Sequence, residues 1–395
     1  MKMKTTQKQS YPQMNKILNC TKIRINNHIH SLRLLIAVIL VMTSHSANAN
    51  MHASPFEFHF NATGIYQNPY EKGIDDDTNI SADLYGRYYG SGYTLNAHIE
   101  ANSTPREKGM ASAISQSNAD ARTALSSNNK GRLQISEFFL STGLTNSTVF
   151  HIGLLDSTAF FDSSNISNNE NTQFIASDFV NNPVIDFPDY SLAGIIEHRF
   201  SNTNITKLMI SSTNGLADNP SRDYSSLFEI NDDKKGIFSI LESKWQSGRE
   251  FFEVGVWSHN GAHQALDNAT QTNLKNYGAY LTAGTGFGAQ SFELRSGYAN
   301  EKVSTATGFA SIAYELSMRR WVFGTAYGYT KISKYITGRK HSVQEVEVYG
   351  RRMIGRKFSI TPSIQYFKNP LHDTNIVPNI SDEIWAANVR FNIEF

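Results

Sequence analysis

The last twelve residues of the chain, 384–395, alternate between two kinds of side chain. One set is wholly apolar and comprises Trp385, Ala387, Val389, Phe391, Ile393 and Phe395. Because successive side chains of a β-strand point to opposite faces, this pattern predicts a strand with one apolar face and one polar or small face. An apolar face that ends on an aromatic residue is typical of a strand that faces lipid. A half-buried strand of a soluble sheet shows the same alternation, so this stretch alone leaves both alternatives open.

The N-terminal segment has the features of an export signal. Seven basic residues precede an apolar run, 34–42, which is too short to span a bilayer as a helix. A small-x-small motif that ends at Ala49 follows, so residues 1–49 are predicted to be a cleaved signal peptide. Translation from Met1 and translation from Met14 both fit this pattern.

Cleavage changes the composition of the mature chain. It removes Cys20, so the mature protein would have no disulfide, no thiolate metal site and no cysteine nucleophile. Of the 36 basic residues, 29 remain against 35 acidic ones, which gives a net charge of −6. This acidic balance argues against a nucleic-acid partner.

The remaining chain, 50–395, is predicted to be one all-β domain of about sixteen strands. Short turns and longer loops alternate strictly between them, as in bacterial outer-membrane barrels, where the short turns are periplasmic and the longer loops extracellular. The expected strands lie near 56–63, 80–90, 93–100, 131–142, 147–155, 190–200, 204–213, 236–246, 250–259, 276–284, 289–300, 307–317, 320–331, 342–352, 357–367 and 384–395. The even count and the alternation predict a transmembrane antiparallel β-barrel of the porin type.

Some segments are less regular than this pattern. The strands near 131–142, 204–213 and 236–246 have no clean alternation. The connection 102–130 is rich in Ser, Ala and Asn, and is expected to be either a mobile surface loop or a loop with a short helix near 110–125.

The longest connection, 156–189, carries the candidate site. It has no Lys or Arg, and it holds six aromatic residues if Tyr190 is included, too many for a loop surrounded by water. A barrel of sixteen strands leaves an aqueous lumen. We therefore expect this third extracellular loop to fold inward, with its aromatic rings on the wall and its carboxylates in the lumen. These carboxylates are Asp156, Asp162, Glu170, Asp178, Asp186 and Asp189.

A basic rim opposite this loop is the second half of the predicted constriction. Its candidate residues are Arg87, Arg295, Arg351 and Arg390, with Arg132 beside them. Aromatic faces and charged or amide groups suit the C–H faces and hydroxyls of sugars. The alternative is that the loop merely narrows the pore, with its acids bound to neighbouring arginines.

Two blocks of sequence resemble the carbohydrate-selective porin (OprB-like) family. The first is FHIGLLD at 150–156, followed by QF at 173–174, VNNP at 180–183, FP at 187–188 and SLAG at 191–194. The second is SIQYFKNP at 363–370, followed by the final strand. The resemblance implies a sixteen-stranded outer-membrane barrel through which sugars diffuse passively.

The expected partners follow from this interpretation. They are outer-membrane lipid and lipopolysaccharide of a Gram-negative bacterium, and small saccharides or other polar solutes. The strand that closes on Phe395 also resembles the signal that barrels present to their assembly machinery. Whether the barrel forms a homotrimer stays open.

Three rival functions remain beside the saccharide porin. One is a general diffusion porin, and another is a surface-binding barrel plugged by its loops. The third is a barrel enzyme, which would need a Ser/His/acid or Asp/His arrangement. Histidines lie on several separate strands, and no local serine motif accompanies them, so we predict no catalytic residue. We also predict no cofactor and no metal site, because no His or acid pair has the spacing of metal ligands.

Overall fold

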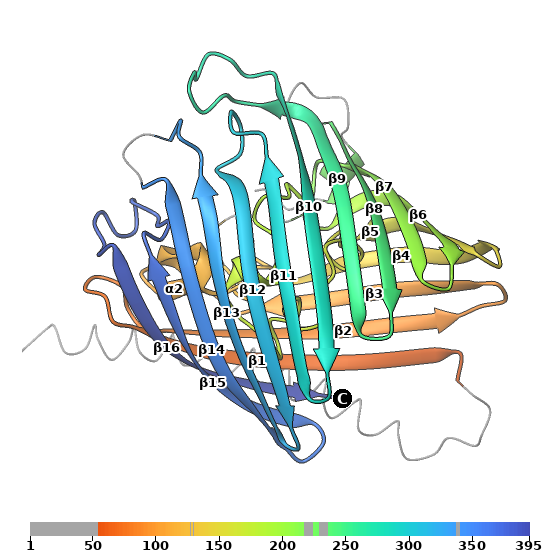
Figure 1. Cartoon of the computed structure of the whole chain (residues 1–395), viewed down its shortest axis with the longest axis horizontal. Coiled ribbons are helices and arrows are strands. Elements are labelled where there is room, and N and C mark those ends of the chain that lie inside the picture. Colours follow the sequence, from red (N-terminus) through yellow and green to blue (C-terminus); the bar gives the residue numbers. More distant parts are fainter. Residues whose placement is uncertain (1–53, 127, 129, 217–223, 229–235, 337–339) are drawn as a thin grey trace, which may run out of the picture. The chain divides into compact units, whose positions relative to one another are not determined.

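The computed structural model describes residues 54–126, 128, 130–216, 224–228, 236–336 and 340–395, and the predicted signal peptide lies outside them. Sixteen strands within these residues form one closed antiparallel barrel (Figure 1). Each strand pairs with its neighbours in sequence, and β1 closes the ring by pairing with β16, with Ala62 opposite Ile393. The strands are β1 (Phe56–Pro69), β2 (Asp77–Tyr89), β3 (Tyr93–Asn102), β4 (Leu133–Thr145), β5 (Thr148–Leu155), β6 (Ser191–Ser201), β7 (Asn204–Ser212), β8 (Ile237–Ser247), β9 (Glu250–His263), β10 (Leu274–Phe287), β11 (Gln290–Ala299), β12 (Ala306–Met318), β13 (Trp321–Ile332), β14 (Ser342–Ile354), β15 (Phe358–Lys368) and β16 (Glu383–Glu394).

The predicted alternation of connections is confirmed. Turns of two or three residues join the strands at one end of the barrel, and every connection at the other end is longer. Gly248 and Gly288 occupy the first position of two-residue turns with positive φ, the conformation that matches the twist of a β-hairpin. We refer to the two ends as the short-turn end and the long-loop end.

The two faces of β16 are as the sequence predicts. Trp385 and Phe391 are about half exposed on the outer face, whereas Asn388 and Arg390 are buried on the inner face. The same division holds on many other strands, so much of the interior is lined by polar groups, whereas Phe238 and Ile240 of β8 make part of the inner face apolar.

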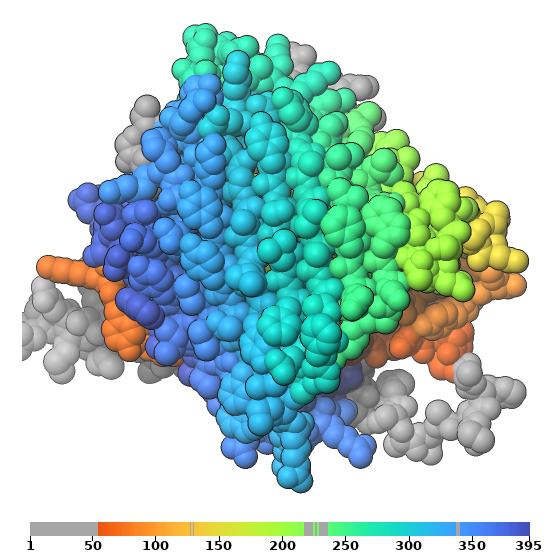
Figure 2. Space-filling view, viewed as in Figure 1, coloured from red at the N-terminus to blue at the C-terminus, as the bar shows by residue number. Residues whose placement is uncertain are grey.

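The outer face of the barrel is apolar over many strands. Figure 2 shows the surface over β10 to β15 as a continuous layer of side chains. Exposed apolar residues of this outer face include Ile210, Val256, Leu294, Ile312, Val348 and Ile364. Exposed apolar side chains that cover a whole wall suit hydrocarbon better than water.

Two connections at the long-loop end turn into the barrel. Loop 103–132 contains the short helix α2 (Met110–Ala113) and the 3₁₀ turn η1 (Ser115–Ser117), and loop 156–190 contains α3 (Ser177–Val180). A further 3₁₀ segment, η2, covers Tyr224–Phe228. None of the described helices is long and apolar enough to cross a membrane.

Candidate functional site

Loop 156–190 is bound to the inner wall of the barrel by carboxylates that accept hydrogen bonds from its backbone. The amide of Asp162 donates to Glu242 on β8 over 2.9 Å, and the amide of Ala176 donates to Glu347 on β14 over 2.9 Å. A third anchor joins the amide of Ser163 to Glu253 over 3.1 Å. A buried carboxylate that accepts backbone N–H groups gains charge-assisted hydrogen bonds, which fix the loop in place. The predicted inward fold of this loop is confirmed.

Two buried arginines of the wall bind the same loop. Arg295 on β11 is 1% exposed and forms an ion pair with Asp162. Arg390 on β16 donates to the backbone carbonyls of Glu170, over 2.5 Å, and Gln173, over 2.7 Å. The guanidinium groups of these two arginines are thus bound to the loop itself, and the pair of Arg295 with Asp162 matches the alternative in which acids of the loop bind neighbouring arginines.

The other two predicted arginines lie nearer the short-turn end. Arg87 is exposed near the end of β2, 3.6 Å from Glu57, and its Nε donates to Asn96 over 3.1 Å. Neither of these partners belongs to loop 156–190. Arg351 lies in β14 close to the turn before β15, and among the described residues its Nε has no hydrogen-bond partner. Among the described residues, no ion pair joins either arginine to a carboxylate of loop 156–190, and their part in the constriction stays a prediction.

The aromatic residues of the loop pack on the wall, as the sequence predicts. Phe174 meets Tyr349 on β14 with ring centroids 5.0 Å apart, and Phe187 meets Phe238 on β8 at 5.9 Å. Burial of several such rings contributes apolar stabilisation in addition to the polar anchors.

Loop 103–132 also fills part of the lumen, and this was not predicted. Most of residues 110–125 are buried, so the expectation of a mobile surface loop is wrong, and the alternative with a short helix is confirmed. Met110 and Ile114 pack against Phe367 of β15 in one apolar cluster. The two inward loops touch each other, since the amide of Ala119 donates to the carbonyl of Ile175 over 2.8 Å.

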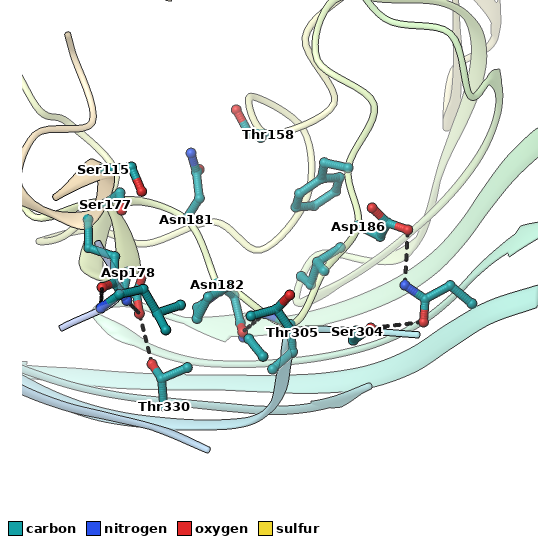
Figure 3. A pocket seen from close by; sticks show the side chains of 18 of the residues that line it. Ser115, Thr158, Ser177, Asp178, Asn181, Asn182, Asp186, Ser304, Thr305 and Thr330 are labelled. Carbon is teal, nitrogen blue, oxygen red and sulfur yellow. Dashed lines mark hydrogen bonds between the residues drawn. The ribbon is translucent and has the colours of Figure 1, made fainter. Parts of the chain in front are cut away.

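A cavity of about 520 Å³ lies between these loops and the wall at the long-loop end (Figure 3). Three of the predicted residues line it, namely Asp178, Asp186 and Asp189. The first two lie at opposite sides of the cavity in Figure 3. Amides and hydroxyls make up much of the remaining lining, including Gln116, Asn181, Asn182, Asn276, Ser304 and Thr330. Among the residues that the structure places around this cavity, none is Lys or Arg.

The two carboxyl groups on its sides have different environments. Burial raises the pKa of Asp178 to about 6, against the hydrogen bond that it accepts from Thr330. Burial also acts on Asp186, but hydrogen bonds from His259 and His263 outweigh it and hold the pKa of this carboxyl below its usual range. Asp186 therefore favours its charged form down to a lower pH than Asp178 does.

The remaining predicted carboxylates lie elsewhere in the lumen. Burial, followed by the charge of Glu137, raises the pKa of Asp156 to about 6. Burial and the nearby charges of Asp83 and Glu100 raise the pKa of Glu170 to about 7. Asp156 and Glu170 thus lie in a cluster of acids beside β2 to β4. Asp162 lies apart from this cluster, in its ion pair with Arg295.

One cluster at the cavity combines residues that the sequence pattern did not connect. His259 and His263 of β9 both lie within 3.0 Å of the carboxylate of Asp186. The sequence predicts no metal site, yet this group has the residue types and proximity of metal ligands. In the sequence, the only signal of this cluster is that His259 and His263 lie four residues apart and so share one face of the strand.

No protein-family model matches the chain. An uncharacterised protein of Aquifex aeolicus is 31% identical over 153 residues, which are 36% of this chain and 48% of that protein. The chain thus spans about half the length of the curated relative that it matches.

Solved structures give a stronger likeness. The high-pH structure of Pseudomonas putida OprB matches with a TM-score of 0.65 at 10% identity, over 86% of this chain and 94% of that chain. The fold is that of a porin. A variant of the Rh. blastica porin matches with a TM-score of 0.54 at 12% identity, over 86% of this chain and all of the other. At such low identity the likeness concerns the fold, a closed sixteen-stranded porin barrel.

Proposed function

We propose that this protein is an outer-membrane channel through which carbohydrates and other small polar solutes diffuse passively. The observation that carries the proposal is the combination of an apolar outer wall with a polar interior that two loops narrow. A chain that only bound ligands at its surface would have no need for a lined cavity inside the barrel. The porin fold of the solved structures supports the same conclusion.

The proposed location is the outer membrane of a Gram-negative bacterium. The apolar outer residues would contact lipid, and the long-loop end would face outward. Export through the signal peptide of residues 1–49 and insertion by the barrel-assembly machinery belong to the same proposal.

The cavity beside loop 156–190 supports the choice of solute. Carboxylates and amides accept and donate hydrogen bonds to sugar hydroxyls, and Phe187 offers an apolar surface for the C–H face of a sugar ring. We assign Asp178, Asp186 and Asp189 to solute contact in this cavity. Asp156, Asp162 and Glu170 shape the constriction, and Arg295 and Arg390 hold it.

A general, cation-preferring porin is the second candidate. It is favoured by the lack of Lys and Arg around the described cavity and by the acid cluster beside β2 to β4. Carboxylates on the path of a solute attract cations and repel anions.

Liposome swelling distinguishes the two candidates. The purified, refolded chain is inserted into liposomes, and swelling is recorded in monosaccharides, disaccharides and an uncharged polyol of similar size. A saccharide channel passes sugars faster than the matched polyol, and Asp178→Asn narrows this difference. Equal swelling rates for sugars and polyols of the same size would favour the general porin. No swelling by folded protein discards both candidates.

A further inference from the structure

A β-bulge in β9 brings two histidines together. His263 pairs with Leu274 and His259 pairs with Asn276. Between these two pairs the chain of β9 moves on by four residues, whereas that of β10 moves on by only two. Residues four apart in a regular strand are separated by about 13 Å. Here the two imidazole rings have centroids 4.4 Å apart and planes at 89°, because the bulge turns both side chains to the same point.

Loop 156–190 places a carboxylate at that point. The Oδ2 atom of Asp186 lies 2.7 Å from Nδ1 of His259 and 3.0 Å from Nε2 of His263. The donor atoms of the three side chains lie within 4.8 Å of one another. Three potential ligands from two separate segments therefore converge on one small volume.

The hydrogen bonds of His263 determine which of its nitrogens carries a proton. Nδ1 faces two carbonyl oxygens, 2.9 Å from Gly261 and 3.3 Å from Leu274, so Nδ1 is the donor. In the neutral ring, Nε2 then directs its lone pair at the carboxylate of Asp186. When the ring is charged, Nε2 instead donates to the carboxylate over 3.0 Å, and a metal ion would take the place of that proton between the two groups.

We propose that Asp186, His259 and His263 bind a divalent transition-metal ion of the Zn²⁺ class. Imidazole and carboxylate are ligands of Zn²⁺, which takes them at about 2.0 to 2.2 Å in a tetrahedral arrangement. Donor atoms of such a site lie about 3.3 Å apart, so the present separations of 2.7 Å and 3.0 Å from Asp186 need to open by about 0.6 Å and 0.3 Å.

The surroundings match those of a metal site. A metal-binding imidazole usually donates its second N–H to a backbone carbonyl, as Nδ1 of His263 does to Gly261. Asn276 donates to the carboxylate of Asp186 over 3.0 Å and is itself oriented by the hydroxyl of Ser304, also over 3.0 Å. Figure 3 shows Asp186 and Ser304 on the same side of the cavity.

The ion would have a fourth position open to the cavity. Asp186 and His263 line that cavity, so a water molecule or a solute group can approach from it. Bound metal would also tie loop 156–190 to β9 and turn a negative group on the cavity wall into a net positive one. Binding of the ion itself can be measured without any solute of the channel.

Metal titration of the full, refolded chain in detergent tests the proposal. Protein stripped with EDTA is titrated with ZnCl₂ by calorimetry and with CoCl₂ by visible absorption. We expect one ion per chain and cobalt bands with the intensity of four-coordination. The variants Asp186→Asn and His263→Gln keep hydrogen-bonding groups and are each expected to weaken binding at least tenfold.

The matched control is His198→Gln on β6, whose imidazole contacts Thr148 over 2.9 Å and lies outside the cluster. Its metal affinity should equal that of the original chain, and heat-modifiable gel migration verifies that every variant is folded. The proposal is overturned if the folded original chain binds no Zn²⁺, or if binding persists undiminished in both Asp186→Asn and His263→Gln. Neither outcome depends on conductance, so a failure of the metal proposal can be told apart from a failure of the proposed channel function.

Discussion

Two loops enter the same lumen but are held there by different forces. Loop 156–190 is anchored mainly by charged wall residues, such as Arg295 and Glu347, which bond to its backbone and to Asp162. Loop 103–132 is anchored by neutral wall groups, since Gln67 and Gln365 both donate to the carbonyl of Ser117, and by apolar packing of Met110 and Ile114 against Phe367. The first kind of anchor places charges on the wall, and the second combines neutral hydrogen bonds with buried apolar area.

The difference shows how a polar lumen keeps a loop in a defined position. Hydrogen bonds from buried charges fix both the place and the orientation of the backbone, because an unpaired charge there is costly. The neutral hydrogen bonds and apolar contacts of loop 103–132 are weaker individually and hold its backbone less firmly. We therefore expect loop 156–190 to be the rigid part of the constriction and loop 103–132 the more adjustable part.

Removal of the Arg295 side chain should have the largest effect. Arg295→Ala leaves the carboxylate of Asp162 buried without its partner, at a cost of about 3 to 5 kcal/mol. Hydrogen exchange of peptides from loop 156–190 should rise strongly, while loop 103–132 changes little. The matched control is Arg351→Ala, which removes an arginine that does not bind the loop. Equal protection of the loop in Arg295→Ala and the original chain would contradict the charged-anchor account.

The corresponding change in the apolar anchor should be smaller. Ile114→Ala deletes a fully buried side chain and is expected to cost about 2 to 4 kcal/mol of local stability. Exchange should then rise in loop 103–132 and remain low around Asp162. A rise of the same size in both loops would show that they unfold as one unit.

The acids of loop 156–190 predict a pH dependence of ion selectivity. Asp156 and Asp178, with pKa values of about 6, and Glu170, with a pKa of about 7, are neutral below these values and charged above them. The preference for K⁺ over Cl⁻ should therefore rise by about two- to threefold between pH 5 and pH 8. Reversal potentials in a KCl gradient measure it. Glu170→Gln should remove the part of the rise near pH 7, and a flat profile would refute the role of these acids.

The smallest expected effect concerns a single wall carboxylate. Glu347 accepts hydrogen bonds from the amides of Ile175 and Ala176, and Glu347→Gln keeps one acceptor oxygen but loses the charge. We expect a loss of about 1 kcal/mol, seen as a modest shift in a urea titration followed by tryptophan fluorescence. A loss as large as that of Arg295→Ala would mean that the two anchors are not ranked as we propose.

The sequence predicted the number and placement of the strands well, because alternation is a local property. The alternation was hard to recognise in strands whose inner face is itself apolar. Phe238 and Ile240 on β8 point inward and pack in the cluster under loop 156–190, so the polar half of the pattern is missing there. In β4 the pairing shifts register around Ser136, and a bulge reverses the parity of the pattern along the strand.

The site was only partly accessible from the sequence. The excess of aromatic residues in loop 156–190 indicated its inward fold, but the pattern could not assign Arg295 to Asp162. Loop 103–132 looked mobile because small and polar residues dominate it, and its anchor depends on the few apolar residues around α2 and on distant wall amides such as Gln365. The histidine cluster needed a bulge in β9 and a carboxylate 73 residues earlier than His259, neither of which follows from local spacing.

Single-channel conductance in a planar bilayer tests the central claim, that anchored loops narrow an open lumen. The refolded chain is compared with the double variant Arg295→Ala, Ile114→Ala, in which both kinds of anchor are weakened. We predict small, stable conductance steps for the original chain and clearly larger, noisier steps for the double variant. An absence of steps from folded original chain, or steps of the same size in both proteins, would contradict the account.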